Sequence, residues 1–173
     1  MNSKLSQSDR INLSATVRVI AMLICTVLFV CIMMLQTSQP DKAVLAEQLR
    51  EEAHAGNFQR VDELLQQGAA VDQADGYGVT ALIEACRTGR DPCVERLLRA
   101  GANVNACAYV YGTPLVQATM NRHATTAEIL LKHGASANLR SPGTNSALWW
   151  AMDFEDSELI RLLSRYRGKA IHV

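Results

Sequence analysis

A motif with a period of 33 residues constrains this chain more than any other feature of its sequence. The triplet at 80–82 (Thr-Ala-Leu) recurs at 113–115 (Thr-Pro-Leu) and at 146–148 (Ser-Ala-Leu), and the Gly-Ala pair at 101–102 recurs at 134–135. A fixed period of this length is typical of stacked supersecondary units, each of which buries its apolar face against a neighbour. The repeat therefore predicts a solenoid, and such stacks usually bind other proteins.

The charge of the chain argues against a nucleic-acid partner. Lys plus Arg equals Asp plus Glu, with 17 of each, and no basic stripe stands out. Neutralising phosphates would require such a stripe. We therefore expect no nucleic acid among the partners. Because no catalytic motif is present either, we also expect no small-molecule substrate.

No arrangement of residues in the sequence predicts catalysis, a metal or a cofactor. The chain lacks a nucleophile elbow, a phosphate loop and a zinc-protease helix motif, and its four histidines are scattered. Among the five cysteines there is no Cys-x-x-Cys pair, so neither zinc nor a disulfide framework is indicated. The acidic cluster at 153–158 is better explained by turn solvation and helix capping, and Ser157 with its acidic neighbours predicts a helix start. We expect the protein not to be an enzyme.

An uncharged apolar run at 19–35 predicts one transmembrane helix. As a helix its 17 residues would cover about 26 Å, slightly less than the hydrocarbon core of a membrane. A cleavable signal peptide is the alternative, because Val44-Leu45-Ala46 resembles a cleavage site. The run is longer than a usual signal-peptide core, however, and that site lies far beyond its end. An uncleaved signal anchor is therefore favoured.

The charges that flank this run predict its orientation. Lys4, Arg10 and Arg18 precede it, whereas only Lys42 and Arg50 follow within reach. By the positive-inside rule, the short tail lies in the cytoplasm and the repeats lie on the extracytoplasmic side, which in a bacterium is the periplasm.

The second unit shows the repeat most clearly. The sequence DGYGVTAL at 75–82 is followed at fixed offsets by Ala-Cys, Gly, Val-x-x-Leu-Leu and Gly-Ala-x-Val-Asn. This pattern resembles the ankyrin repeat, a turn followed by two antiparallel helices, and the resemblance covers about 42–169. It implies an all-α solenoid of about four helix-turn-helix units with short β-hairpin loops. The predicted parts are a tail at 1–18, the membrane helix at 19–35, a linker at 36–41, units at 42–74, 75–107, 108–140 and 141–169, and a tail at 170–173.

Local signals place several helix starts. Asp41 and Asn57 are predicted to cap the two helices of the first unit, and Asp91 to cap the second helix of the next unit, with Pro92 at its first position. Gly68 and Gly101 are predicted to end second helices in the left-handed conformation.

The chain departs from the ankyrin pattern after its Thr-Pro-Leu motif. The histidine that usually follows is Ile83, Val116 or Trp149 here, so apolar packing must replace its hydrogen bonds. By this alignment Trp149 is assigned to the core, and Trp150 is the better candidate for an exposed anchor. Ala108 and Tyr111 replace the expected Asp and Gly in the third unit, which predicts an irregular loop there.

The resemblance also implies a binding surface. In ankyrin-like stacks the loop tips and the faces of the first helices line a concave groove that captures partners. Six of the nine aromatic residues lie on or beside this surface, and aromatic residues often anchor interfaces. The positions that map onto the groove are Tyr77, Val79, Glu84, Arg87, Tyr109, Val110, Gln117, Met120, Trp150 and Asp153.

Two functions of different kinds are therefore predicted. The first is a membrane-tethered interaction module that binds a protein partner through the groove. The alternative is an exported accessory or inhibitor protein released after signal cleavage. An enzyme or metal protein is the least expected outcome.

Overall fold

The computed structural model describes residues 22, 24, 26–30 and 41–167. The chain divides into two units, at 1–40 and 41–173. In the first unit, the described residues are helical. Within the described residues, no helix combines the length and the apolar character that crossing a membrane requires. Most of the predicted membrane helix at 19–35, the tails at 1–18 and 170–173, and all of the predicted linker except Asp41 lie outside the described residues.

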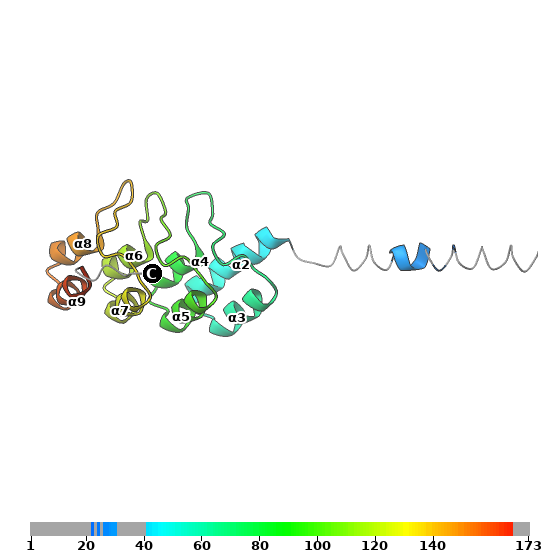
Figure 1. Cartoon of the computed structure of the whole chain (residues 1–173), viewed down its shortest axis with the longest axis horizontal. Helices are drawn as coiled ribbons and strands as arrows, with labels where there is room; N and C mark the ends of the chain where they lie inside the picture. Colours follow the sequence, from blue (N-terminus) through cyan, green and yellow to red (C-terminus); the bar gives the residue numbers. More distant parts are fainter. Residues whose placement is uncertain (1–21, 23, 25, 31–40, 168–173) are drawn as a thin grey trace, which may run out of the picture. The chain divides into compact units, whose positions relative to one another are not determined.

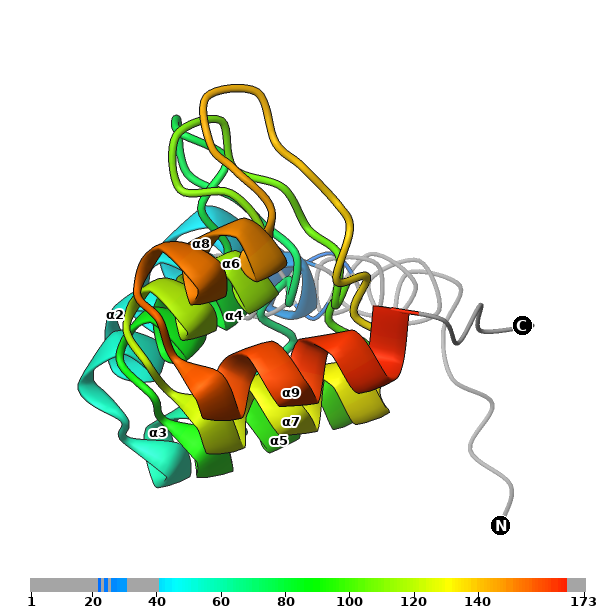
Figure 2. The same cartoon turned by 90° about the vertical axis from the view of Figure 1, so that its left-hand side faces the viewer.

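The second unit consists of helices that follow one another in pairs (Figure 1). The first helix of each pair lies in one row and the second helix in another, and the intervening long loops extend from the same side of the stack (Figure 2). Each helix contacts its counterparts in the neighbouring pairs. The pairs are α2 (Lys42–Ala55) with α3 (Phe58–Gln66), α4 (Ala81–Arg87) with α5 (Asp91–Arg99), α6 (Pro114–Met120) with α7 (Ala124–Lys132), and α8 (Ala147–Asp153) with α9 (Ser157–Arg167).

The repeated Thr/Ser triplet starts the first helix of the later pairs. The side chains of Thr80, Thr113 and Ser146 accept hydrogen bonds from the backbone N–H three residues ahead, at 3.4, 3.2 and 3.4 Å. Each bond satisfies one of the N–H groups that a helix leaves unpaired at its first turn. The most regular part of the sequence repeat is thus a set of helix caps.

The other predicted caps have mixed outcomes. The Asn57 side chain caps α3 by accepting from the Arg60 N–H, as predicted. Asp41 precedes α2, but its side chain makes no capping bond. The prediction for Asp91 was wrong, because α5 is preceded by Arg90 and the Asp91 carboxylate accepts from the Thr126 hydroxyl of the next pair.

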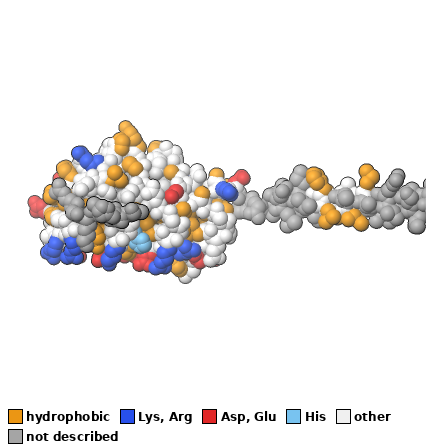
Figure 3. Space-filling model, in the orientation of Figure 1, with side chains coloured by type: hydrophobic (Ala, Val, Ile, Leu, Met, Phe, Trp, Pro, Cys, Tyr) orange, Lys and Arg blue, Asp and Glu red, His pale blue; other side chains and the backbone are white. Residues whose placement is uncertain are grey.

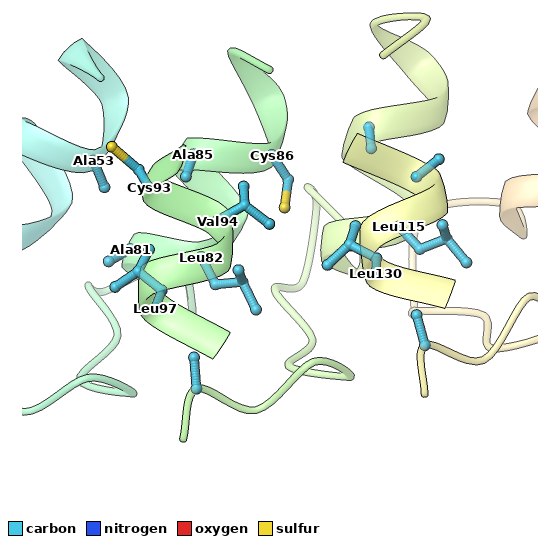
Figure 4. Close-up of a cluster of buried hydrophobic side chains, with 14 of the residues drawn as sticks. Ala53, Ala81, Leu82, Ala85, Cys86, Cys93, Val94, Leu97, Leu115 and Leu130 are labelled. Atoms are coloured by element: carbon cyan, nitrogen blue, oxygen red, sulfur yellow. The ribbon is translucent and has the colours of Figure 1, made fainter. Parts of the chain in front are cut away.

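Among the described residues, the larger of two apolar clusters is a band of small and branched side chains between the two rows (Figure 4), and a smaller cluster of Val79, Ile83 and Ala108 lies apart from it. Leu82, Val94, Leu97 and Leu130 are fully buried in the band. Cys86 and Cys93 are free, buried thiols in the same band. Burial raises the pKa of Cys86 well above its ordinary value, and the negative charge of Asp91 adds to that rise. These thiols therefore pack as small hydrophobic groups.

The loops differ from the predicted β-hairpins. Across the described residues there is no strand, only an antiparallel bridge between Ala108 and Gly112. The corresponding loop of the second unit has the equivalent backbone bond, in which the Asp75 N–H donates to the Val79 carbonyl at 3.1 Å. It also folds around the carboxylate of Asp75, which accepts from the N–H groups of Tyr77 and Val79 at 2.8 and 2.9 Å. Because Ala108 stands at the position of Asp75, the loop of the third unit lacks these carboxylate bonds, and there the Gly112 N–H donates to the Ala108 carbonyl at 2.9 Å. This is the irregularity that the sequence predicted.

Candidate binding surface

The candidate site is the surface formed by the loop tips and by the first helices α4, α6 and α8. Of these three helices, α8 alone carries exposed residues, whereas Glu84, Arg87 and Met120 on α4 and α6 are half-buried. Tyr77, Tyr109 and Val110 are 70, 68 and 61% exposed, which agrees with their predicted position on a surface. The Tyr109 N–H donates to the Tyr77 carbonyl at 3.3 Å, so these two tips lie side by side. Figure 3 shows hydrophobic side chains over the loop tips, whereas charged side chains gather over the second-helix row. We call Tyr77, Tyr109, Val110 and Tyr111 the tip cluster.

Two predicted surface positions are buried. Val79 is 2% exposed because it packs against Ile83 and against Ala108 of the next loop. Gln117 is 5% exposed, and its amide donates to the Tyr111 carbonyl. Both residues support the tip cluster from beneath and cannot serve as main contacts of a partner.

The two tryptophans exchange their predicted roles. Trp149 is 44% exposed, whereas Trp150 is partly buried against the core and its indole N–H donates to the Thr144 hydroxyl at 3.3 Å. The alignment placed Trp149 in the core because Ile83 and Val116 are buried. Those two residues have a following repeat beside them, whereas α8 belongs to the last described pair.

An aromatic group extends the apolar surface at α8. The ring centroids of Trp149 and Trp150 lie 5.0 Å apart in an edge-to-face arrangement, and Phe154 lies 5.6 Å from Trp150. Such contacts stabilise the orientation of the rings beyond the area they bury. Met152 is 53% exposed on the same helix, and Asp153 is exposed beside it. Met120 of α6 is partly buried against the core.

Glu84 and Arg87 lie together on α4, as one turn of helix predicts. The Glu84 carboxylate accepts from the Arg87 guanidinium at 2.7 and 3.1 Å. The imidazole Nδ1 of His54, on α2, lies 3.0 Å from both side chains. This contact joins the first two helix pairs on the first-helix face.

These residues line a cavity of about 320 Å³ between α2 and the second pair, which we call the charged cavity. Its lining consists of four acidic residues, two arginines and one histidine: Glu47, Glu51, Asp75, Glu84, Arg50, Arg87 and His54. Sequence reasoning identified only Glu84 and Arg87. A signal for others was present, because Glu51 and His54 precede Glu84 and Arg87 by one period of 33 residues.

Comparison with known proteins agrees with this architecture. Residues 51–108 match a family model described as ankyrin repeats (3 copies). No curated protein matches the chain. Within this segment the chain is similar to ankyrin repeats, and the stacked helix pairs agree with that similarity. Ankyrin repeats suggest a protein–protein interaction module.

Proposed function

We propose that this protein is a membrane-tethered interaction module that captures a protein partner on its loop tips and first-helix face. The observation that carries the proposal is the exposure of large apolar side chains in the tip cluster and on α8. Exposed aromatic side chains that cluster on one surface commonly mark a site where another protein binds. The proposed activity is binding alone, with no catalytic step.

The tether is proposed from the apolar run at 19–35. Its described residues are helical, and Met22, Val27 and Phe29 expose 73, 60 and 62% of their surfaces. Exposed side chains of this kind lose their contact with water when a helix inserts into lipid, which favours insertion. The flanking charges favour a cytoplasmic tail and extracytoplasmic repeats.

Release by signal cleavage is less compatible with the fold. Cleavage after Ala46 would remove the first turn of α2, including Leu45 and Ala46, which are 3 and 1% exposed. Losing Leu45 would remove part of the apolar face with which the first pair covers the stack. The mass of the mature protein tests this point, because the exported alternative requires the loss of about 46 residues at that site.

Site-specific photo-crosslinking in native membranes tests the binding surface. A photoreactive phenylalanine replaces Tyr109 on the loop tip or, as a matched control, Arg99 on the second-helix row. We expect one defined adduct from position 109 and none from position 99. An adduct that forms equally from both positions would contradict the proposed surface.

Alanine variants then measure how much the aromatic side chains of this surface contribute to partner binding. Tyr109→Ala and Trp149→Ala should each reduce capture of the crosslinked partner by about tenfold or more, since aromatic anchors carry much of the energy of an interface. Glu95→Ala is the control, because Glu95 lies on the second-helix row, where its side chain is 44% exposed. Unchanged capture by both aromatic variants would contradict the proposed binding surface. The proposed orientation of the repeats is tested separately, by protease access from each side of the membrane.

A further inference from the structure

The charged cavity contains more negative than positive side chains. Its two guanidinium groups already have partners in the protein. Arg50 pairs with Glu47 and donates to the Gln73 carbonyl at 3.2 Å, while Arg87 pairs with Glu84. Two of the four carboxylates are therefore not neutralised by these arginines, and the cavity lining holds two more carboxylates than guanidinium groups.

A second cavity shows that this imbalance is not general. It occupies about 230 Å³ between α7 and α9, in the second-helix row. Its charged lining is balanced, with Glu128 and Glu158 opposed by Arg161 and Arg165. The excess of carboxylates therefore distinguishes the charged cavity on the first-helix face.

The charged cavity continues into the apolar surface. Asp75 lines the cavity, and its carboxylate also accepts the N–H of Tyr77 at the first loop tip. The Tyr77 carbonyl in turn accepts the N–H of Tyr109. A partner segment lying along this face would thus meet carboxylates at one end and aromatic rings at the other.

We infer that the charged cavity is a subsite for a Lys or Arg side chain of the protein partner, whose neighbouring apolar side chains lie over the tip cluster. The inference rests on the proposed function and specifies the chemistry of the partner. A volume of about 320 Å³ is at the small end of the range for ligand pockets and suits one long side chain. Carboxylates attract a guanidinium or ammonium group by charge, and a planar guanidinium can also bind them in a bidentate manner.

A matched pair of peptides tests the subsite without the natural partner. The probes are Ac-Leu-Arg-Leu-NH2 and Ac-Leu-Cit-Leu-NH2, in which citrulline replaces the guanidinium with a neutral group of similar shape. The full chain in detergent micelles is titrated with each probe and followed by NMR of backbone amides. We expect the arginine peptide to shift the resonances of His54, Glu84 and Arg87, and to bind at least about tenfold more tightly than the citrulline peptide. Added salt should weaken the arginine peptide selectively.

Two charge variants locate the effect. Glu51→Gln removes an exposed carboxylate of the charged cavity, and we expect it to weaken the arginine peptide about threefold to tenfold while leaving the citrulline peptide unchanged. Glu128→Gln, in the second cavity, is the matched control and should change neither affinity. Equal affinities for the two peptides, no shifts at the cavity, or an equal effect of both variants would each overturn the inference.

The same titration separates this inference from the proposed function. If Trp149→Ala abolishes partner capture but the arginine peptide does not bind the cavity, the binding surface stands and the cationic subsite fails. If the peptide binds with charge selectivity but neither aromatic variant affects capture, the subsite stands and the proposed binding surface fails.

Discussion

In the second helix pair, Cys86 and Cys93 occupy the positions that Thr119 and Thr126 occupy in the third pair. All four residues are buried. The thiols need no hydrogen-bond partner, whereas each hydroxyl has one: Thr119 donates to the Leu115 carbonyl at 2.8 Å, and Thr126 to the carboxylate of Asp91. The same buried position can therefore hold either a thiol or a hydroxyl side chain, provided that the hydroxyl has a hydrogen-bond partner.

The second-helix row shows a similar change from charge to apolar contact. Arg96 of α5 pairs with Asp62 of α3, which joins the first two pairs. One and two periods later, the position of Arg96 holds Ile129 and Leu162, which are partly buried against the core. The first half of the stack is therefore linked partly by ion pairs, and the second half more by apolar packing.

A third difference lies in the left-handed residue of the turn that joins the first helix of each pair to the second. Gly56 and Gly89 have φ angles of 83° and 65° there, whereas Arg122 and Glu155 have φ angles of 59° and 53° at the equivalent positions. Non-glycine residues adopt this left-handed conformation at a cost. The repeat therefore fixes the backbone conformation more strictly than it fixes the residue.

The largest effect is expected from cavities in the shared core. Leu97→Ala and Leu130→Ala, in fragments beginning at Asp41, should each lower the free energy of unfolding by about 2–5 kcal/mol, because both leucines are fully buried. Urea denaturation measures both values. If the losses of unfolding free energy for the two variants differ by more than about 3 kcal/mol, the width of the expected range, the two halves of the stack are not packed equivalently.

The next largest effect is expected from replacing glycines that have a left-handed backbone conformation. Gly101→Ala should cost about 1–2 kcal/mol from backbone strain alone, since its φ is 89° and no atom lies within 4 Å of an added Cβ. Gly89→Ala should cost more, because its Cβ would lie 2.6 Å from the His123 ring. Equal costs in urea denaturation would show that the His123 ring moves away freely.

The buried thiol predicts a loss of stability at alkaline pH. Because burial raises the pKa of Cys86 above its unfolded value, the native state holds the proton longer, and stability falls as the pH rises past about 9. The slope contributed by this group is at most about 1.4 kcal/mol per pH unit. Cys86→Thr, which copies Thr119, should remove that contribution. An unchanged pH profile of urea denaturation would contradict the assignment to Cys86.

Glycine at the strained positions should stabilise the second half. Glu155→Gly is expected to raise the free energy of unfolding by about 1 kcal/mol, because relief of the left-handed strain exceeds the added entropy of the unfolded chain. Arg122→Gly should gain less, since its guanidinium lies 5.3 Å from the centre of the Phe154 ring and that contact would be lost. The order of the two melting temperatures tests this difference.

The smallest effect is expected from the ion pair between α3 and α5. A double-mutant cycle of Asp62→Ala and Arg96→Ala should give a coupling of about 0.2–1 kcal/mol, because both side chains are partly exposed to solvent. The coupling should fall as salt is added. A large coupling that salt does not change would mean that the first half depends on charge far more than its exposure suggests.

The helix pairs, one of their caps and two of their turns could be predicted from the sequence. The 33-residue spacing located the helix pairs, Asn57 identified a cap, and the glycines at 68 and 101 indicated left-handed turns. These features depend on a few consecutive residues, so periodicity and side-chain chemistry suffice to find them. The resemblance to ankyrin repeats placed Tyr77, Tyr109 and Val110 on the surface, and their side chains are exposed.

The tertiary structure decided what depends on the position of a repeat within the stack. Trp149 aligns with buried residues but is exposed, because the residues with which it aligns have a following helix pair beside them, whereas α8 belongs to the last pair that the structure describes. Asp91 looks like a cap but serves the next pair, because Thr126 lies within reach only after the pairs stack. The charged cavity likewise joins residues from α2, α4 and a loop. One-dimensional spacing specifies each hairpin, whereas burial and charge at its edges depend on which neighbour covers it.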